Sequence, residues 1–247
     1  MSLDRFQEAG EHYRKLSVLV PQDPGAWAGL GQCYEALAQA EFANLGHEAR
    51  NSGYWFALMA EARIKSQQYK SAFYLGRQAL DLTPNLSGVH SELAEIYRQS
   101  GRSDWAVREE EKERKLPPPD CATHKAEREF FAGHFLQAVT ASATDNTPEA
   151  HYWRTKAFNT LANNAYARLQ QLPPSVESFE QAAMVRRSQR RFREEADAWR
   201  EALKLAPNDP GIETQLAFAL DQTGDYAAAR AILQPLAEHN PNSAMVN

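Results

Sequence analysis

The stretch that decides the fold is PGIETQLAFALDQTGDYAAARAILQPLAEHNP, residues 210–241. Apolar residues recur at helical spacing on both sides of Gly224, which predicts two short amphipathic helices. Gly224 permits the left-handed backbone that ends the first helix in a tight turn, and Pro241 ends the second. Small residues such as Ala217 and Ala229 let the two helices approach closely. The stretch therefore predicts an antiparallel helix hairpin.

Features of this hairpin recur upstream at a fixed interval. Prolines that follow an apolar run are about 34 residues apart in two pairs, Pro84 with Pro118 and Pro207 with Pro241. Within these intervals the small residues and glycines fall in phase, so that Gly101 takes the place of Gly224. A period of this length is typical of stacked helix hairpins.

Segment 24–52 opens with the pattern W-x2-L-G-x2-Y, formed by Trp27, Leu30, Gly31 and Tyr34. With the proline interval, this pattern resembles the tetratricopeptide-repeat (TPR) family, and the resemblance covers nearly the whole chain. It implies an all-α fold, a right-handed α-solenoid of stacked antiparallel helix hairpins known as the TPR superhelix.

We expect a single TPR array over residues 1–247. A shift of about 123 residues superposes 53–118 on 176–241 without a gap, which predicts a duplicated block. The expected divisions are a half repeat 1–23, a first block of 24–52, 53–86 and 87–120, a diverged repeat 121–146, and a second block of 147–175, 176–209 and 210–243. Neither end resembles a capping repeat, so we expect a piece of a longer array.

Two of these segments, 24–52 and 147–175, depart from the pattern. They resemble each other in YEALAQAEFANL (34–45) and FNTLANNAYARL (158–169), and neither has a glycine between its two expected helices. Each is either a compact hairpin with a minimal turn or one longer helix. We favour the hairpin.

Composition excludes several classes of protein. Hydrophobic residues make up 43% of the 247 residues, enough for a core, and the formal charge of −5 argues against an obligate nucleic-acid binder. No run of about 18 apolar residues is present, and the first residues do not resemble a signal peptide. Cys33 and Cys121 are expected to be reduced thiols. A cytoplasmic location is favoured without being determined, and export stays open because we expect an incomplete N-terminus.

The sequence contains no catalytic constellation. Patterns such as H-E-x-x-H, G-x-S-x-G and the P-loop are absent, and we interpret Gly29-x-Gly31 as a helix-packing site. The most metal-like group is Cys121, His124, Glu127 and His134, but a helix end and a turn would both have to bring these side chains to one point. We interpret them as ordinary surface or inter-repeat residues. We expect no enzymatic activity, no cofactor and no metal.

The most unusual charge feature is a run of five arginines within eight residues: Arg186, Arg187, Arg190, Arg191 and Arg193. Such a run is able to bind phosphates or an acidic peptide. On the repeat template it falls at the end of a first helix, where cations also favour the free carbonyl groups. We favour the solvated, dipole-matched interpretation and keep the run as a candidate acidic-partner patch.

The resemblance implies a binding surface on the first helix of each repeat, which lines the concave face of the superhelix. TPR proteins bind extended peptides or partner helices there. Carrying these positions across gives the candidate groove Gln32, Glu35, Tyr54, Glu61, Ser91, Glu95, Arg98, Met184, Arg187 and Phe218. The lysine and asparagine set of the chaperone-binding carboxylate clamp does not occur in order at these positions, so we do not expect that role.

The resulting hypothesis is a non-catalytic scaffold that binds a partner peptide or helix in the concave groove. The alternative is a regulatory TPR module of a larger protein whose enzymatic or DNA-binding domain lies outside this chain. A third hypothesis is a structural spacer or self-association through exposed end repeats. We expect a protein or peptide partner, no nucleic acid and no membrane.

Overall fold

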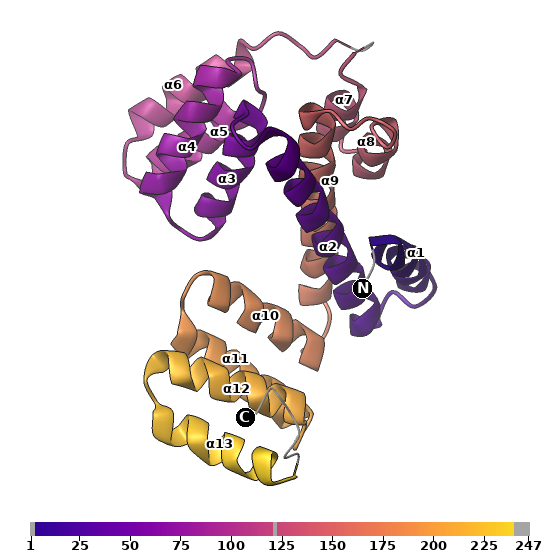
Figure 1. Ribbon diagram of the computed structural model, residues 1–247, viewed down its shortest axis with the longest axis vertical. Helices are drawn as coiled ribbons and strands as arrows, with labels where there is room; N and C mark the ends of the chain where they lie inside the picture. The colour runs from indigo at the N-terminus through magenta and orange to yellow at the C-terminus, as the bar shows by residue number, and fades with distance from the viewer. Residues whose placement is uncertain (1–2, 121–122, 240–247) are drawn as a thin grey trace. The chain divides into compact units, whose positions relative to one another are not determined.

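The computed structural model describes residues 3–120 and 123–239, and in this part of the chain every regular element is an α-helix (Figure 1). This confirms the predicted all-α class. The helices are α1 Leu3–Leu19, α2 Pro24–Ala49, α3 Gly53–Lys65, α4 Tyr69–Leu82, α5 Val89–Gln99, α6 Ser103–Arg114, α7 Lys125–Phe131, α8 Phe135–Ala141, α9 Pro148–Gln170, α10 Val176–Ser188, α11 Phe192–Leu205, α12 Pro210–Thr223 and α13 Tyr226–His239.

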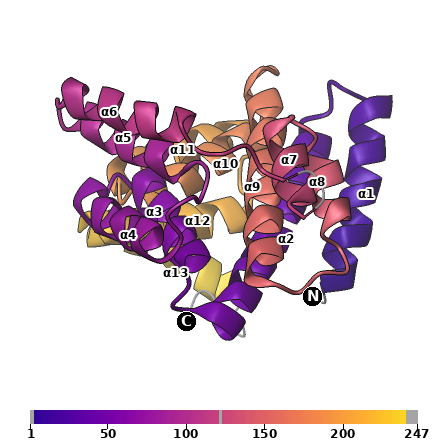
Figure 2. The ribbon, with the colours of Figure 1, turned by 90° about the horizontal axis from the view of Figure 1, so that it is seen from above.

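The predicted hairpins form neighbouring antiparallel helix pairs: α3 with α4, α5 with α6, α10 with α11, and α12 with α13 (Figures 1 and 2). Gly101 and Gly224 have φ of 71° and 85° in the turns inside two of these pairs, as the sequence predicts. Only glycine adopts this left-handed backbone at little cost.

Segments 24–52 and 147–175 form the long helices α2 and α9, so the favoured hairpin interpretation is wrong. Their sequences contain no proline beyond the first residue of each helix and no turn sequence that would end a helix. Buried residues lie on more than one side of each helix, as Ala26 and Ala28 on opposite sides of α2 illustrate. A helix with apolar residues around it can pack along its whole length.

Contacts divide the chain into two compact units, which we describe separately. Unit 1 contains residues 1–11 and 31–164, and unit 2 contains residues 12–30 and 165–247. Each has its own hydrophobic core. The largest buried side chains are Trp153, Tyr152 and Leu93 in unit 1 and Trp199 in unit 2.

In unit 1, the second part of α2 and the first part of α9 lie side by side (Figures 1 and 2). Tyr34 and Phe158, which correspond in the two similar segments, stack with ring centroids 6.1 Å apart. Glu41 Oε2 of α2 lies 2.6 Å from Nδ1 of the buried His151 and 2.9 Å from Nε of the buried Arg154. Charged hydrogen bonds therefore join the two long helices inside the unit.

In unit 2, helix ends are fixed by their own sequences. Ser175 caps α10 in a capping box, and Asp209 accepts from the first amides of α12, which begins with Pro210.

Gly29 of α2 lies under the ring of Tyr13 of α1, where a Cβ would come within 2.4 Å of the ring. Gly29 is thus a helix-packing residue, as the sequence predicts.

The helices in the described part of the chain are too short or too polar to cross a bilayer. Cys33 is a buried free thiol, and burial raises its pKa. Cys121 lies outside the described residues.

Candidate functional site

The first helices of unit 1, α3 and α5, carry α9 of the same chain on the face where the groove is expected. Lys156 Nζ of α9 lies 3.2 Å from Glu61 Oε2 of α3 and 3.1 Å from Glu92 Oε1 of α5. Nζ also lies 5.6 Å from the ring centroid of Tyr152. The candidate groove residue Glu61 therefore binds a lysine of its own chain.

This buried cluster places two carboxylates on one ammonium group. Burial raises the pKa of Glu92 to about 7, although Lys156 opposes the shift. Burial also acts on Glu61, but the charges of Lys156 and Lys65 outweigh it and lower the pKa of Glu61 to about 2. The two carboxylates hold the pKa of Lys156 well above its usual value despite its burial. The charged Lys156 thus stabilises the ionised form of Glu61, whereas Glu92 tends to stay protonated.

Tyr54 of α3, another candidate groove residue, is also in contact with α9. Its ring centroid lies 5.4 Å from that of Tyr152, and its hydroxyl donates to Glu149 Oε2 at 3.5 Å. Burial, with Glu149 and Glu127 nearby, raises the pKa of Tyr54 to about 12. Tyr54 and Glu61 are therefore both used to hold α9.

The remaining candidate groove residues of unit 1 lie nearer the surface. Arg98 pairs with Glu95 at 3.0 Å within α5 and with Glu110 of α6. The amide of Ser91 donates to Glu113 at 3.1 Å. Gln32 and Glu35 are exposed on α2.

In unit 2 the corresponding positions are different in character. The shift of about 123 residues aligns Met184 with Glu61 and Phe218 with Glu95. Met184 of α10 is 48% exposed and Phe218 of α12 is 43% exposed. We call Met184, Arg187, Gln215 and Phe218 the first-helix face of unit 2. It presents two large apolar side chains to solvent.

Arg187 links the two helices of this face. Its Nε donates to Glu195 Oε1 at 2.6 Å, and one terminal nitrogen donates to Gln215 Oε1 of α12 at 2.7 Å. Glu195 of α11 is only 1% exposed. The guanidinium therefore neutralises a buried carboxylate and fixes α10 against α11 and α12.

The candidate acidic-partner patch is not one cluster of free guanidinium groups. Arg186 and Arg191 both pair with Glu194, at 3.4 and 2.5 Å. Arg193 lines a hollow of about 560 Å³ together with Asp197, Arg200 and Asp225. Arg190 has a φ of 60° in the turn after α10 and makes no ion pair within the described residues. An acidic partner at this patch would have to compete with Glu194 and Glu195.

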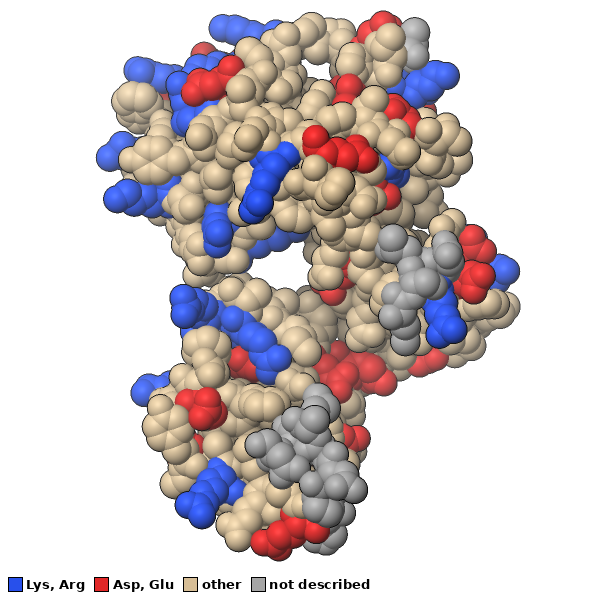
Figure 3. Space-filling view, viewed as in Figure 1, with Lys and Arg blue, Asp and Glu red and all other residues tan. Residues whose placement is uncertain are grey.

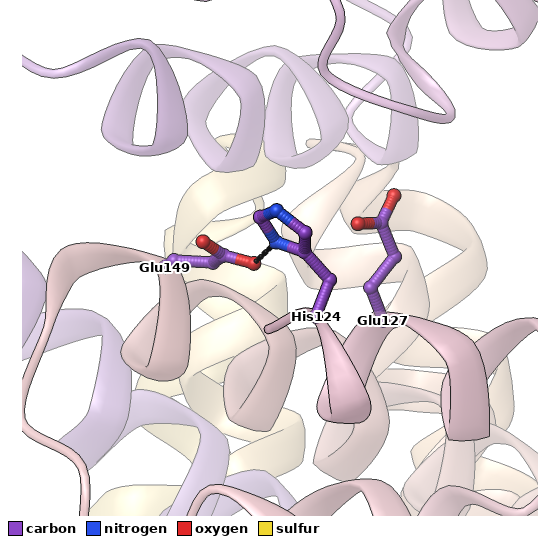
Figure 4. A group of neighbouring side chains, drawn as sticks. All are labelled: His124, Glu127 and Glu149. Atoms are coloured by element: carbon purple, nitrogen blue, oxygen red, sulfur yellow. Dashed lines mark hydrogen bonds and ion pairs between the residues drawn. The ribbon is translucent and has the colours of Figure 1, made fainter. Parts of the chain in front are cut away.

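The structure brings together part of the group that looked most metal-like in the sequence. His124 and Glu127 lie beside Glu149 of α9 (Figure 4). His134 instead lies 3.0 Å from Glu129, and Cys121 is outside the described residues. Sequence reasoning missed Glu149 because it is 25 residues from His124, on another helix.

On the face drawn in Figure 3, basic and acidic side chains are interspersed, and uncharged surface separates them. This distribution fits the mild net charge of −5.

Three comparisons relate the chain to known proteins. A family model described as a tetratricopeptide repeat matches residues 194–247. A search of curated proteins finds no relative. A search of solved structures matches the APC/C hetero-tetramer Cut9–Hcn1, YrrB, described as a TPR protein with an unusual peptide-binding site, and the TPR domain of P58(IPK).

The similarity to these structures is distant. Sequence identities are 12%, 13% and 13%, with TM-scores of 0.31, 0.30 and 0.30. The matches cover 98%, 83% and 98% of this chain and 51%, 95% and 90% of the respective structures. The chain therefore spans about half the length of the first of these proteins.

Proposed function

We propose that the chain, whose residues 194–247 match a tetratricopeptide-repeat model, is a non-catalytic scaffold that binds a partner peptide or helix on the first-helix face of unit 2. The observation that carries this proposal is the exposure of Met184 and Phe218 on neighbouring first helices, at 48% and 43%. These two helices are joined by the hydrogen bond from Arg187 to Gln215, and large apolar side chains exposed on one face are typical anchor points for a partner.

The corresponding face of unit 1 is a less suitable site for a partner. There, Tyr54 and Glu61 already contact α9, which contributes Tyr152 and Lys156. A partner would have to displace this helix and leave two carboxylates without their ammonium group. We therefore assign binding to unit 2, where Met184 takes the place of Glu61 and Gln215 that of Glu92.

The chemistry of the face defines the partner. Packed helices have axes about 8–10 Å apart, so side chains that contact Met184 and Phe218 together must be separated by a similar distance. Residues i and i+7 of a helix, or i and i+3 of a polyproline II segment, lie on one face roughly 10 Å apart and meet this requirement. Arg187, whose side chain is 38% exposed, lies on the same face, and its charge is paired with Glu195. The partner is thus a peptide with two apolar anchors and a polar group between them.

A displayed library of random peptides tests the proposal. The purified chain should enrich peptides with two apolar residues at one of these spacings. Replacement of both anchors, Met184→Ser with Phe218→Ser, should weaken binding of the enriched peptides by about 100-fold, because each lost anchor costs on the order of 1–2 kcal/mol.

The matched control is Leu205→Ser on α11, because Leu205 is 52% exposed but belongs to a second helix. This variant should bind the peptides as the unmodified chain does. Equal binding by the double variant, or equal loss in the control, would show that the first-helix face of unit 2 is not the binding surface.

A further inference from the structure

His124, Glu127 and Glu149 of unit 1 direct their side chains toward a common point (Figure 4). His124 precedes α7, Glu127 lies in the first turn of α7, and Glu149 lies in the first turn of α9. One ligand atom from each lies within 4.8 Å of the other two. His124 Nδ1 is 2.6 Å from Glu149 Oε1.

These side chains line a pocket of about 320 Å³, and the pocket has an excess of negative charge. Its described lining also includes Asp120 and the phenol of Tyr54, and it contains no lysine or arginine. Glu149 pairs with His124, while Glu127 makes no ion pair within the described part of the chain. A carboxylate oxygen of Glu127 lies within 4.8 Å of one of Glu149. The carboxylates are thus crowded in a place where a cation would relieve their repulsion.

We propose that this pocket binds one divalent transition-metal ion through His124, Glu127 and Glu149, and that Zn²⁺ is its occupant. Zinc bonds to imidazole nitrogen and carboxylate oxygen are about 2.0–2.2 Å long, so tetrahedral ligands lie about 3.3 Å apart. The ligand atoms now lie within 4.8 Å of one another, and rotations of the side chains must bring them to that separation. The pocket leaves room for a water molecule as fourth ligand. An imidazole ligand disfavours Mg²⁺ and Ca²⁺, which take oxygen ligands.

The ion would have a structural effect that is independent of peptide binding. Glu149 belongs to α9, whereas His124 directly precedes α7 and Glu127 lies in its first turn, so a bound ion ties the diverged α7–α8 pair to the long helix. The ion would also replace the hydrogen bond between His124 Nδ1 and Glu149 Oε1. When Nδ1 carries a proton, zinc binding therefore releases that proton.

The test uses the full chain without an affinity tag, after a chelator has removed bound metal. Titration with Zn²⁺ against a chromogenic chelator should give one site per chain. His124→Ala and Glu127→Gln should each weaken this site by more than about 100-fold, which exceeds the loss for residues that merely support a metal ligand. Mg²⁺ and Ca²⁺ should not compete. Far-UV circular dichroism checks that each variant keeps its helices.

His134→Ala is the matched control, since His134 belongs to the same α7–α8 pair but contacts Glu129. It should leave the zinc site unchanged. Should His124→Ala fail to fold, Glu149→Gln keeps the shape of the side chain and should show the same loss. The proposal is overturned when the unmodified chain binds no zinc, or when its site survives Glu127→Gln and Glu149→Gln.

Discussion

A single backbone position determines how each helix pair turns. The residue with positive φ between the two helices is Gln67, Gly101, Gly133, Arg190 or Gly224, with φ of 58°, 71°, 78°, 60° and 85°. Three pairs use glycine, and two place a residue with a Cβ in the same left-handed conformation. An L-residue there costs about 1–2 kcal/mol relative to its preferred conformation.

This difference predicts opposite effects of two substitutions in unit 2. Gly224→Val should lower the free energy of unfolding by roughly 1–2 kcal/mol, because a β-branched residue is strained at a φ of 85°. Arg190→Gly should raise it by up to about 1 kcal/mol, since part of the gain is lost to the greater freedom of glycine in the unfolded chain. Urea denaturation measures both values.

Gln222→Ala serves as the control, because Gln222 is exposed near the end of α12 without a positive φ, and it should change the free energy of unfolding by less than about 0.5 kcal/mol. A stability change in Arg190→Gly of the same sign as in Gly224→Val would contradict the argument. The equivalent change in unit 1, Gln67→Gly, should repeat the gain.

The same residues show what the sequence predicts at this scale. Gly101 and Gly224 identify their turns because glycine is itself the signal, whereas Gln67 and Arg190 carry no such signal and only the repeat spacing points to them. The pairing of Glu61 with Lys156 joins residues 95 positions apart, which local spacing does not reveal.

At the scale of elements, helix pairs could be predicted and the long helices could not. The predicted hairpins repeat a closing proline and an alternation of small and large residues, and those around Gly101 and Gly224 also have a glycine in the turn. Helices α2 and α9 lack a breaker, so their patterns are compatible with either one helix or two. Tertiary contacts decide between these alternatives, because Glu41 and Tyr34 of α2 contact α9 along a continuous surface.

The contact of α9 with α3 and α5 makes stability depend on pH. The pKa of Glu92 is about 7 in the folded chain and near 4.5 without the fold. Between these two values Glu92 keeps its proton in the folded state and loses it in the unfolded state. Its contribution to the free energy of unfolding is therefore complete below pH 4.5 and is lost as the pH rises through about 7. Glu92→Gln removes the titration and keeps the shape of the side chain.

We expect the difference in the free energy of unfolding, Glu92→Gln minus the unmodified chain, to increase from pH 5 to pH 7. The increase should be up to about 1 kcal/mol per pH unit. Chemical denaturation at several pH values measures this difference. Glu111→Gln on the exposed face of α6 is the control and should show no such trend. A flat difference for Glu92→Gln would show that the carboxyl is ionised throughout.

At the scale of the whole molecule, the chain contains two separately packed cores. The core of unit 1 is formed by residues such as Leu93, Tyr152 and Trp153, and that of unit 2 by residues such as Trp199 and Leu216. Repeat proteins are stabilised mainly by contacts between neighbouring helices, so a local defect weakens the elements around it.

Lys156→Met should therefore destabilise unit 1 by about 3–5 kcal/mol, because it leaves Glu92 without a counter-charge and Glu61 with only Lys65. Hydrogen exchange should accelerate in α3–α6 and stay unchanged in α10–α13. Trp199→Ala, a defect of about 3–5 kcal/mol in the other core, should produce the reverse pattern. Lys156→Met combined with Glu61→Gln and Glu92→Gln should recover most of the protection, since no charge is then left buried. Uniform acceleration over all helices in both variants would mean that the two cores unfold as one cooperative unit.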